Sequence, residues 1–247
     1  MIPLNLIVNA DDFGINDSVN KAILWAYQQN YINSTSLIPN RDGYDQAVKF
    51  FHNYKSIIKN VGVHINLADG TPVTDFKIKS FLKANGEWDI NATGKKLQFF
   101  NTLSINSFKT EIKAQIEKVL TAKIPITHID SHLHLHTLPK FINIFLDLAA
   151  EYNIKLRLAQ TYKEDNLSKF LLRRFLNHKI KAKSLNYSDR FETVDYFLLN
   201  YKNLNITEVT EIMIHPDFDQ FGKLTDHYNP SDMINWISFL DMLKGGS

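Results

Sequence analysis

Residues 4–14 read Leu-Asn-Leu-Ile-Val-Asn-Ala-Asp-Asp-Phe-Gly, an apolar stretch that runs into two adjacent acids. A short apolar run of this kind predicts a buried strand, here at Leu4–Ala10. Behind an expected cap at Asn16, apolar residues recur at helical spacing from Val19 to Tyr27. A strand followed at once by an amphipathic helix is the repeating unit of a parallel sheet. The opening of the chain therefore predicts an α/β fold.

The same alternation continues through the 247 residues. Helical spacing recurs over Phe108–Leu120 and Phe141–Ala149, with Pro139 expected in the first turn of the second segment. No glycine-rich phosphate loop follows the first strand, which favours a closed barrel over an open sheet. We expect a single-domain distorted β/α barrel over residues 1–244, with residues 245–247 set apart as a tail remnant. The predicted strands are Leu4–Ala10, Thr35–Ile38, Val61–Leu67, Thr127–Asp130, Ile154–Ala159, Tyr196–Leu199 and Glu211–His215.

One long interruption, at about residues 68–106, breaks this alternation. A connection of this length inside a compact domain is typically a functional insertion, so we expect it to lie over the site as a lid. A surface excursion without a role is the alternative. Trp88 lies on a predicted turn and is the residue of the insertion expected to contact substrate. The phenylalanines are expected to form a small core of their own: Phe76, Phe81, Phe99 and Phe100.

The composition narrows the class of protein. Hydrophobic residues make up 44% of the chain, and Lys+Arg 28 against Asp+Glu 26 leaves a net charge of +2. This balance predicts no nucleic-acid partner, and the lack of a signal peptide or an apolar window of about 18 residues predicts no membrane partner and a cytoplasmic location.

The basic run Lys169–Lys183 is expected to be a helix with a solvated face; a membrane or nucleic-acid surface is the alternative. Without cysteine, any metal must be held by nitrogen and oxygen ligands.

Histidines are concentrated in one segment. Residues 128–136 read His-Ile-Asp-Ser-His-Leu-His-Leu-His and hold four of the nine histidines. Alternate residues of an extended chain point to one side, so His132, His134 and His136 are expected to face the same way. This concentration beside Asp130, directly after an apolar strand, predicts a metal or substrate site. A polar edge without chemistry is the alternative.

Other polar signals lie at the ends of predicted strands. Asp11 and Asp12 are adjacent carboxylates, which repel each other unless a cation or a proton lies between them. A metal would account for one and a general base for the other, whereas a helix cap with a first-turn acid is the alternative. His64 and His215 also lie in or after apolar strands, although His64 alone is equally well explained as a core histidine. Because the carboxyl ends of barrel strands open onto one face, we expect these residues to share a divalent-cation site with His132, for Zn²⁺, Mg²⁺, Mn²⁺, Co²⁺ or Fe²⁺.

At these positions the chain resembles the YdjC-like carbohydrate deacetylase family. The family's Asn-Ala-Asp-Asp-Phe-Gly occupies residues 9–14, and its Gly-x-His-x-x-Leu occupies residues 62–67. Its histidine-rich stretch and its His-Pro follow in the same order, at residues 128–136 and 215–216. The resemblance implies a metal-dependent enzyme on a barrel akin to polysaccharide deacetylases. Such an enzyme would remove the N-acetyl group from an acetamido sugar or short oligosaccharide, such as a chitooligosaccharide, and would form a homodimer.

The resemblance also implies roles for individual residues. Asp12, His64 and His132 would hold the divalent metal ion, expected to be Mg²⁺ or Zn²⁺. Asp11 would act as the general base and His215 as the general acid. The mechanism implied is attack of an activated water on the amide, with release of acetate.

Supporting roles follow in the same way. Arg157 would hold the Asp11 carboxylate ionised, and Asp130 would orient a ligating histidine. His134 and His136 would line the substrate pocket.

Two other functions stay open. A metal-dependent phosphoesterase of the histidinol-phosphatase type also uses a His-x-His after a strand, although there the motif normally opens the chain. A non-catalytic sugar-binding protein on the same scaffold would need neither the base Asp11 nor the acid His215. Leu133 and Asp217 depart from the residues expected in relatives, so the transfer of substrate specificity is weaker than that of the metal ligands.

Overall fold

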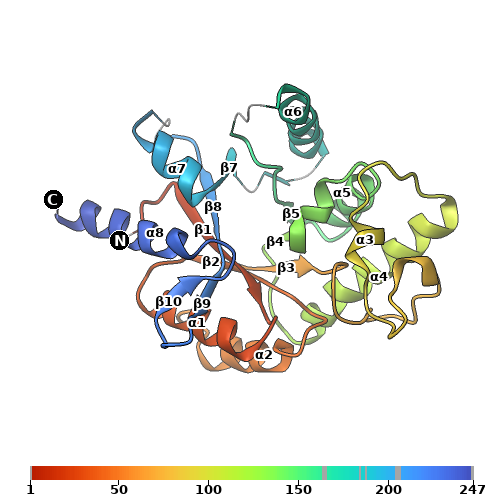
Figure 1. Ribbon diagram of the computed structural model, residues 1–247, viewed down its shortest axis with the longest axis horizontal. Coiled ribbons are helices and arrows are strands. Elements are labelled where there is room, and N and C mark those ends of the chain that lie inside the picture. Colours follow the sequence, from red (N-terminus) through yellow and green to blue (C-terminus); the bar gives the residue numbers. More distant parts are fainter. Residues whose placement is uncertain (1, 163–165, 184, 187, 204–206, 246–247) are drawn as a thin grey trace.

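The computed structural model describes residues 2–162, 166–183, 185–186, 188–203 and 207–245. Its centre is one curled sheet with the strand order β6-β5-β4-β3-β2-β1-β8-β7, in which every neighbouring pair is parallel (Figure 1). The strands are β1 (Leu6–Phe13), β2 (Ser34–Leu37), β3 (Val61–Ile65), β4 (His128–Ser131), β5 (Lys155–Leu156), β6 (Leu185–Asn186), β7 (Arg190–Thr193) and β8 (Thr210–Ile214).

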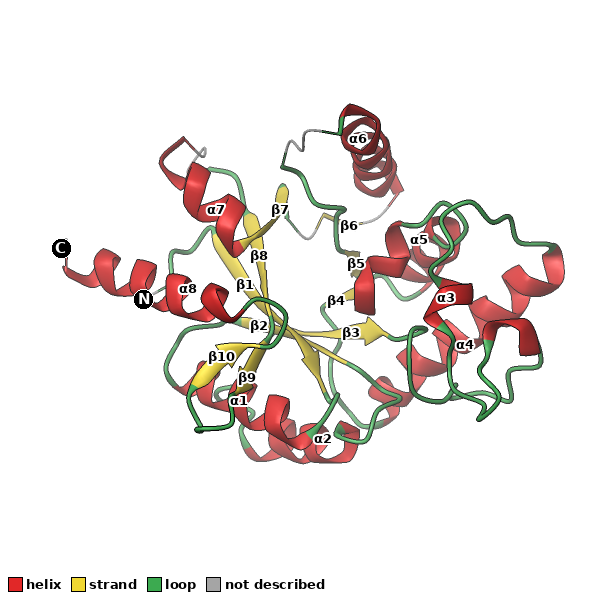
Figure 2. Cartoon of the chain, viewed as in Figure 1, coloured by secondary structure: helices red, strands yellow, loops and turns green. Residues whose placement is uncertain are grey.

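Helices surround the outside of this sheet (Figure 2). A separate antiparallel hairpin, β9 (Pro216–Phe218) and β10 (Leu224–Asp226), follows β8 and packs against the first helix. The α-helices are α1 (Asp17–Gln28), α2 (Tyr44–Asn53), α3 (Ile90–Thr93), α4 (Thr102–Thr121), α5 (Ile142–Glu151), α6 (Leu167–Lys183), α7 (Val194–Asn200) and α8 (Pro230–Gly245). The 3-10 segments are η1 (Lys79–Phe81), η2 (His132–Thr137) and η3 (Tyr201–Asn203).

The predicted fold class is confirmed: the protein is α/β, with a parallel sheet curled into a half-barrel. Between its edge strands β6 and β7, the described residues form no ladder. Instead, Thr161, which follows β5 in the chain, forms hydrogen bonds with Phe191 of β7. Its N–H donates to the Phe191 carbonyl at 2.9 Å, and its hydroxyl oxygen accepts from the Phe191 N–H at 3.2 Å. The barrel is therefore distorted at one seam.

The first helix forms as its sequence predicts. The Asn16 side chain accepts a hydrogen bond from the Val19 N–H at 2.9 Å, which caps the helix, and Val19, Ala22 and Ile23 are buried against the sheet. The helix over Ile142–Glu151 begins later than expected, because Pro139 lies in the turn that precedes it.

The predicted strand at Tyr196–Leu199 is wrong. These residues lie in α7, and the strand that pairs with β8 is Arg190–Thr193, which the sequence analysis did not predict. Tyr-Phe-Leu-Leu is a short apolar run, and such a run fits a buried helix turn as well as a strand. Arg-Phe-Glu-Thr has one strongly apolar residue and gives no strand signal.

The segment between β3 and α4 carries several aromatic residues. Trp88 is fully buried, with its ring centroid 4.8 Å from that of Phe76 and 5.9 Å from that of Phe108. This corrects the expectation that Trp88 offers its ring to substrate. The prediction that the phenylalanines form a small core of their own is wrong: Phe76, Phe81 and Phe100 pack on Phe108 of α4 as part of the main hydrophobic core, and Phe99 is 98% exposed.

The basic run at Lys169–Lys183 is part of α6. This helix buries Leu176, Asn177 and Ile180 and exposes most of its cationic side chains, as expected for a solvated face. Among the described residues, no helix combines the length and hydropathy needed to cross a membrane.

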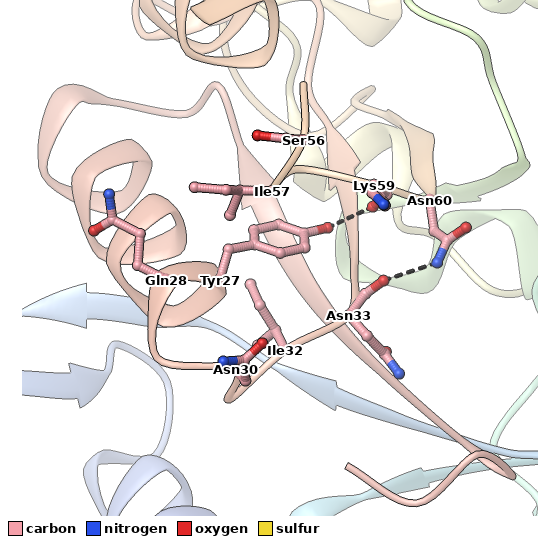
Figure 3. A pocket seen from close by; sticks show the side chains of 9 residues that line it. All are labelled: Tyr27, Gln28, Asn30, Ile32, Asn33, Ser56, Ile57, Lys59 and Asn60. Atoms are coloured by element: carbon pink, nitrogen blue, oxygen red, sulfur yellow. Dashed lines mark hydrogen bonds between the residues drawn. The ribbon is translucent and has the colours of Figure 1, made fainter. Parts of the chain in front are cut away.

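A hollow lies at the amino-terminal ends of β2 and β3, and we call it the N-terminal hollow (Figure 3). Its volume is about 500 Å³. The Tyr27 hydroxyl donates to the Lys59 carbonyl at 2.6 Å, and the Asn60 amide donates to the Asn33 carbonyl at 2.9 Å. The residues around it are Tyr27, Gln28, Asn30, Ile32, Asn33, Ser56, Ile57, Lys59 and Asn60.

Candidate active site

The two adjacent acids lie at an irregularity near the end of β1. In a regular strand, successive side chains point to opposite faces, so Asp11 and Asp12 would separate. Here the register between β1 and β2 shifts between Ala10 and Phe13, and Asp12 adopts a left-handed φ of 69°. A bulge of this kind re-aims a side chain. Both carboxylates are consequently buried on the same side, at 2% and 0% exposure.

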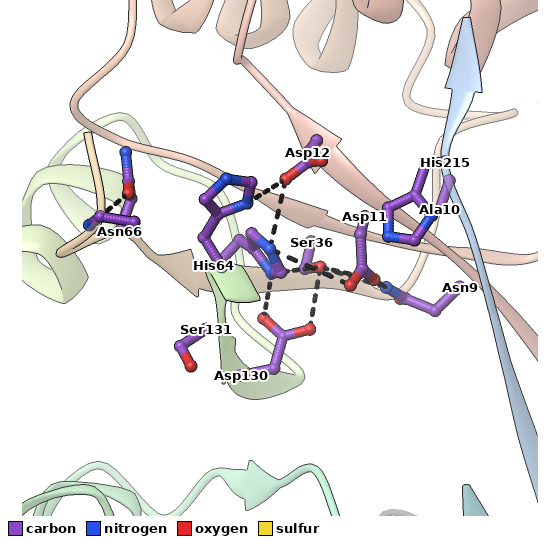
Figure 4. A network of polar contacts seen from close by, with 12 residues as sticks. Asn9, Ala10, Asp11, Asp12, Ser36, His64, Asn66, Asp130, Ser131 and His215 are labelled. Atoms are coloured by element: carbon purple, nitrogen blue, oxygen red, sulfur yellow. Dashed lines mark hydrogen bonds and ion pairs between the residues drawn. The ribbon is translucent and has the colours of Figure 1, made fainter. Parts of the chain in front are cut away.

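Asp12 contacts two histidines, His64 of β3 (Figure 4) and His132 of η2. Its Oδ1 lies 2.8 Å from His132 Nδ1 and 3.3 Å from His64 Nε2. The other nitrogen of His64, Nδ1, is 2.8 Å from Asp130 Oδ1, so Asp130 fixes the ring orientation. The structure thus brings together Asp12, His64 and His132, as predicted, with Asp130 behind them.

These three side chains fit a divalent cation. Each offers one ligand atom, and the three atoms lie within 4.8 Å of one another in a buried position. Burial alone would lower the pKa of His64, but Asp130 and Asp11 raise it to about 10. Although burial opposes this, hydrogen bonds from His132, His227 and His64 hold the pKa of Asp12 well below its usual value. The local field therefore favours positive charge where the ligand atoms converge.

Asp11 is held by a buried arginine. Arg157 donates from Nη1 to Asp11 Oδ2 and from Nη2 to Asp11 Oδ1, both at 2.7 Å, and the Asn9 amide adds a third bond at 2.8 Å. Burial would raise the pKa of Asp11, but the Arg157 and His64 charges lower it below its usual value. Asp11 is therefore an anion at neutral pH, as predicted from the resemblance.

His215 follows β8 directly and lines the same pocket as Asp11, beside which it lies because the preceding residues, Ile214 and Ala10, are register partners on neighbouring strands (Figure 4). Its Nδ1 lies 3.5 Å from Asp226 Oδ2, and its backbone N–H donates to that oxygen at 2.6 Å. Burial would lower the pKa of His215, but Asp226 raises it above its usual value. The imidazole is thus favoured in its protonated form, which is able to donate a proton.

The pocket formed by these residues has a volume of about 200 Å³. Leu133, Met213 and Tyr228 give it an apolar side, and Tyr228 is 53% exposed. The described residues that line it include no lysine or arginine. They are Asp11, His64, His132, Leu133, His134, Met213, His215 and Tyr228.

The histidine-rich segment is not extended, which corrects the prediction that its histidines face one way. After β4 it forms η2, in which Leu133 and His134 have left-handed φ values of 53° and 55°. His132 turns to Asp12, His134 lines the pocket, and His136 is fully buried with its Nδ1 2.8 Å from the Ser131 hydroxyl. Burial lowers the pKa of His134 to about 4 and that of His136 to about 3, so both are neutral at pH 7.

Gly62 in β3 makes room for the first histidine of that segment. A Cβ at Gly62 would lie 2.3 Å from His128 Nε2, a separation that no real contact tolerates. The ring of His128 is fully buried there, and burial lowers its pKa to about 4. The glycine of the Gly-x-His motif is therefore a packing requirement next to the site.

Sequence reasoning missed three residues of the site. Asp226 is the last residue of β10, His227 and Tyr228 follow it, and His227 Nε2 lies 3.1 Å from Asp12 Oδ2. No apolar strand immediately precedes them, so the pattern that found the other residues could not find these. Their only signal is the adjacent acid, histidine and tyrosine.

This fold and site define a class: α/β half-barrel proteins with a buried Asp–His–His group and a pocket lined by an aspartate and a histidine at the carboxyl edge of the sheet. The sequence model of the YdjC-like protein family matches residues 5–236, and the chain belongs to this family.

Named relatives and a solved structure agree with this assignment. The chain is 30% identical over 232 residues to the carbohydrate deacetylase of Brevibacillus brevis, covering 90% of this chain and 85% of that one. It is 28% identical over 229 residues to the carbohydrate deacetylase of Vibrio campbellii, covering 88% and 80%. The crystal structure of a putative cellobiose-phosphate cleavage protein from Enterococcus faecalis superposes with a TM-score of 0.70 at 22% identity, covering 87% and 82%. That likeness supports the fold.

Proposed function

We propose that the protein is a metal-dependent carbohydrate deacetylase, which hydrolyses the N-acetyl group of an acetamido sugar or short oligosaccharide and releases acetate. The names of its relatives support the sugar and the reaction. The observation that carries the proposal is the pocket that Asp11 and His215 line together with His64 and His132. Amide hydrolysis needs a base for the water and an acid for the leaving nitrogen, and this pocket offers both.

Asp12, His64 and His132 are the proposed ligands of a divalent cation. When bound, the cation would supply Lewis-acid chemistry to the acetyl carbonyl. Two imidazole nitrogens and one carboxylate oxygen suit Zn²⁺ better than Mg²⁺, so Zn²⁺ is the metal that the donor set favours.

Asp11 is the proposed general base. It is an anion with one face turned to the pocket, and Arg157 fixes its plane with two hydrogen bonds. It would take the proton of the attacking water. The bidentate pair prevents the carboxylate from rotating away during that transfer.

His215 is the proposed general acid. The Asp226 carboxylate orients its Nδ1 side, which leaves Nε2 to deliver a proton to the departing amine nitrogen. Because its pKa is raised, the protonated form persists at neutral pH.

The pocket favours a small acetylated group. Met213 and Leu133 offer apolar surface for the acetyl methyl, and Tyr228 offers the aromatic face for a sugar ring that Trp88 cannot. The absence of lysine and arginine from the described lining disfavours phosphate esters, which need cationic contacts. The cytoplasmic location and the homodimer remain predictions.

The test is acetate release from N-acetylglucosamine, diacetylchitobiose and other acetamido sugars, with added Zn²⁺ or Mg²⁺ and with EDTA. We expect release that depends on the metal and is lost in Asp11→Asn. Phosphate release from sugar phosphates, with no acetate from any sugar, would instead support the phosphoesterase. Tight sugar binding without turnover by a metal-loaded protein would support the binding protein.

A further inference from the structure

Arg157 forms several ion pairs in the interior of the protein. It is fully buried, and its guanidinium meets three carboxylates. Two of them, Asp11 and Asp130, belong to the candidate site described above. The third is Glu211, whose Oε1 accepts from Arg157 Nε at 2.7 Å. The ring of Phe191 covers one face of the guanidinium, with its centroid 4.9 Å from Cζ.

Glu211 lies on β8, between β1 and the edge strand β7. Its register neighbours are Ile7 on β1 and Phe191 on β7, so neither adjacent strand places a titratable group directly beside it. Its side chain is fully buried. Oε1 has the one bond to Arg157, and Oε2 has no hydrogen-bond partner among the described residues.

The three carboxylates differ in how well they are supported. Asp11 accepts from Arg157 twice and from Asn9, and Asp130 accepts from Arg157 and the Ser36 hydroxyl and contacts His64 Nδ1. Glu211 has a single donor. A buried anionic oxygen without a donor is costly, whereas a protonated oxygen is much less so. If one of these groups carries a proton, it is therefore Glu211.

The electrostatics agree with this geometry. Burial raises the pKa of Glu211 to about 8, and the nearby charges are Arg157, which lowers it, and Asp130 and Asp11, which raise it. Arg157 thus compensates two anions at neutral pH instead of three.

We propose that Glu211 is a positioning residue for the base: as a neutral acid it holds Arg157 through Nε and leaves the guanidinium charge to Asp11 and Asp130. This inference rests on the proposed role of Asp11. It predicts that the hydrogen-bond acceptor at position 211 matters for activity and that a negative charge there does not.

The first experiment compares kcat/KM for acetate release against pH in Glu211→Gln and Glu211→Leu. Glutamine keeps a neutral acceptor, so we expect activity within about threefold of wild type at pH 7 and an unchanged acid limb. Leucine removes the acceptor and loosens Arg157, so the apparent pKa of Asp11 should rise and the acid limb should move to higher pH. Glu192→Leu is the matched control, because Glu192 is a buried glutamate on the adjacent strand that bonds to Thr161 and Arg190. The acid limb of the pH profile of Glu192→Leu should stay in place.

Two outcomes would overturn the proposal. A loss of about tenfold or more in Glu211→Gln at pH 7 would mean that the anion is required. An acid limb that Glu211→Leu leaves in place would mean that Glu211 has no influence on the base.

The second experiment needs no turnover. A carboxyl whose pKa rises from 4.5 to about 8 on folding binds its proton in the folded state, so the wild type loses stability as pH rises through that interval. The Tm of Glu211→Gln minus that of wild type should therefore increase between pH 5 and pH 8. Glu151→Gln is the control, because the hydrogen bond from Lys113 lowers the pKa of Glu151, so its carboxylate takes up no proton on folding above pH 5 and its Tm difference should not rise.

The two experiments separate the two claims. A Tm difference that stays flat from pH 5 to pH 8 refutes the neutral Glu211, whatever the protein catalyses. A wild type that releases no acetate from any sugar refutes the proposed function and the base role of Asp11 together, even when the Tm difference behaves as expected.

Discussion

The two ends of the same strands carry two different hollows. The N-terminal hollow has a volume of about 500 Å³, and the pocket at the carboxyl ends has about 200 Å³. In the larger one, polar side chains are committed to the backbone: Tyr27 to Lys59, and Asn33 to the Val8 N–H and the Leu6 carbonyl. In the smaller one, charged groups face one another with ligand atoms turned to a common point.

This difference indicates which of the two hollows is suited to catalysis. A hollow whose polar atoms are satisfied by backbone groups stabilises loops, and its size reflects how those loops meet. A pocket that concentrates buried carboxylates and imidazoles has shifted pKa values and is suited to binding a cation and moving protons. Substitutions at the two ends should consequently affect different measurements.

The largest effect is expected for Asp12→Ala. Both His64 and His132 contact Asp12, so its removal takes away the carboxylate of the proposed metal site. We expect a loss of about 10³-fold or more in kcat/KM, together with loss of bound metal measured by elemental analysis. Wild-type metal content in this variant would remove Asp12 from the ligand set.

A smaller loss is expected for His215→Ala. Removing the acid should cost about 10²-fold in rate, the lower end of what general-acid catalysis supplies, and the metal should remain bound because His215 lies outside the proposed ligands. The measurement is kcat for acetate release alongside metal content. A variant that keeps wild-type kcat would disprove the assignment of the acid.

Asp226→Asn should change the pH profile more than the maximal rate. Asp226 raises the pKa of His215 above 6.5, and without that anion the pKa of His215 falls. The protonated acid is then lost at lower pH, so the alkaline limb of kcat should move to lower pH. A limb that does not move would mean that Asp226 only fixes the hairpin.

The smallest effects on catalysis are expected at the N-terminal hollow. Asn33→Ala removes two hydrogen bonds to β1 and should lower the free energy of unfolding by about 1–3 kcal/mol, and Tyr27→Phe should lower it by about 1 kcal/mol. Urea unfolding measures both. Their kcat/KM should equal that of wild type; a drop at unchanged stability would show that the two ends are coupled.

Sequence patterns predicted much of the fold because the strands that carry the site are apolar. The segments at β1, β3, β4 and β8 are short buried runs with polar residues at their carboxyl ends, so their order and parallel arrangement could be predicted. β7 could not be predicted, because Phe191, which packs on Arg157, is its only apolar residue and the other residues of the strand are polar.

The residues of the candidate site could be predicted from the sequence, but the backbone geometry that orients them could not. Asp11, Asp12, His64, His132 and His215 were all found from strand ends, and the structure brings them to one pocket or its edge. The backbone turns that aim them were not visible in the sequence. Left-handed Asp12 and His134 are unfavourable conformations that only the surrounding packing maintains. Asp226 and His227 lie at the end of the β9–β10 hairpin, and no local sequence pattern predicts that this hairpin places them at the site.

Gly62 has a consequence for any saturation mutagenesis of this protein. Every other amino acid would place a Cβ within 2.3 Å of the His128 ring, at the base of the strands that carry His64 and Asp130. An activity screen would therefore score position 62 as intolerant as the proposed base and acid, although Gly62 is not among the residues that line the pocket. A parallel screen for soluble expression would separate the two kinds of position: Gly62 variants should fail both screens, and Asp11 variants only the first.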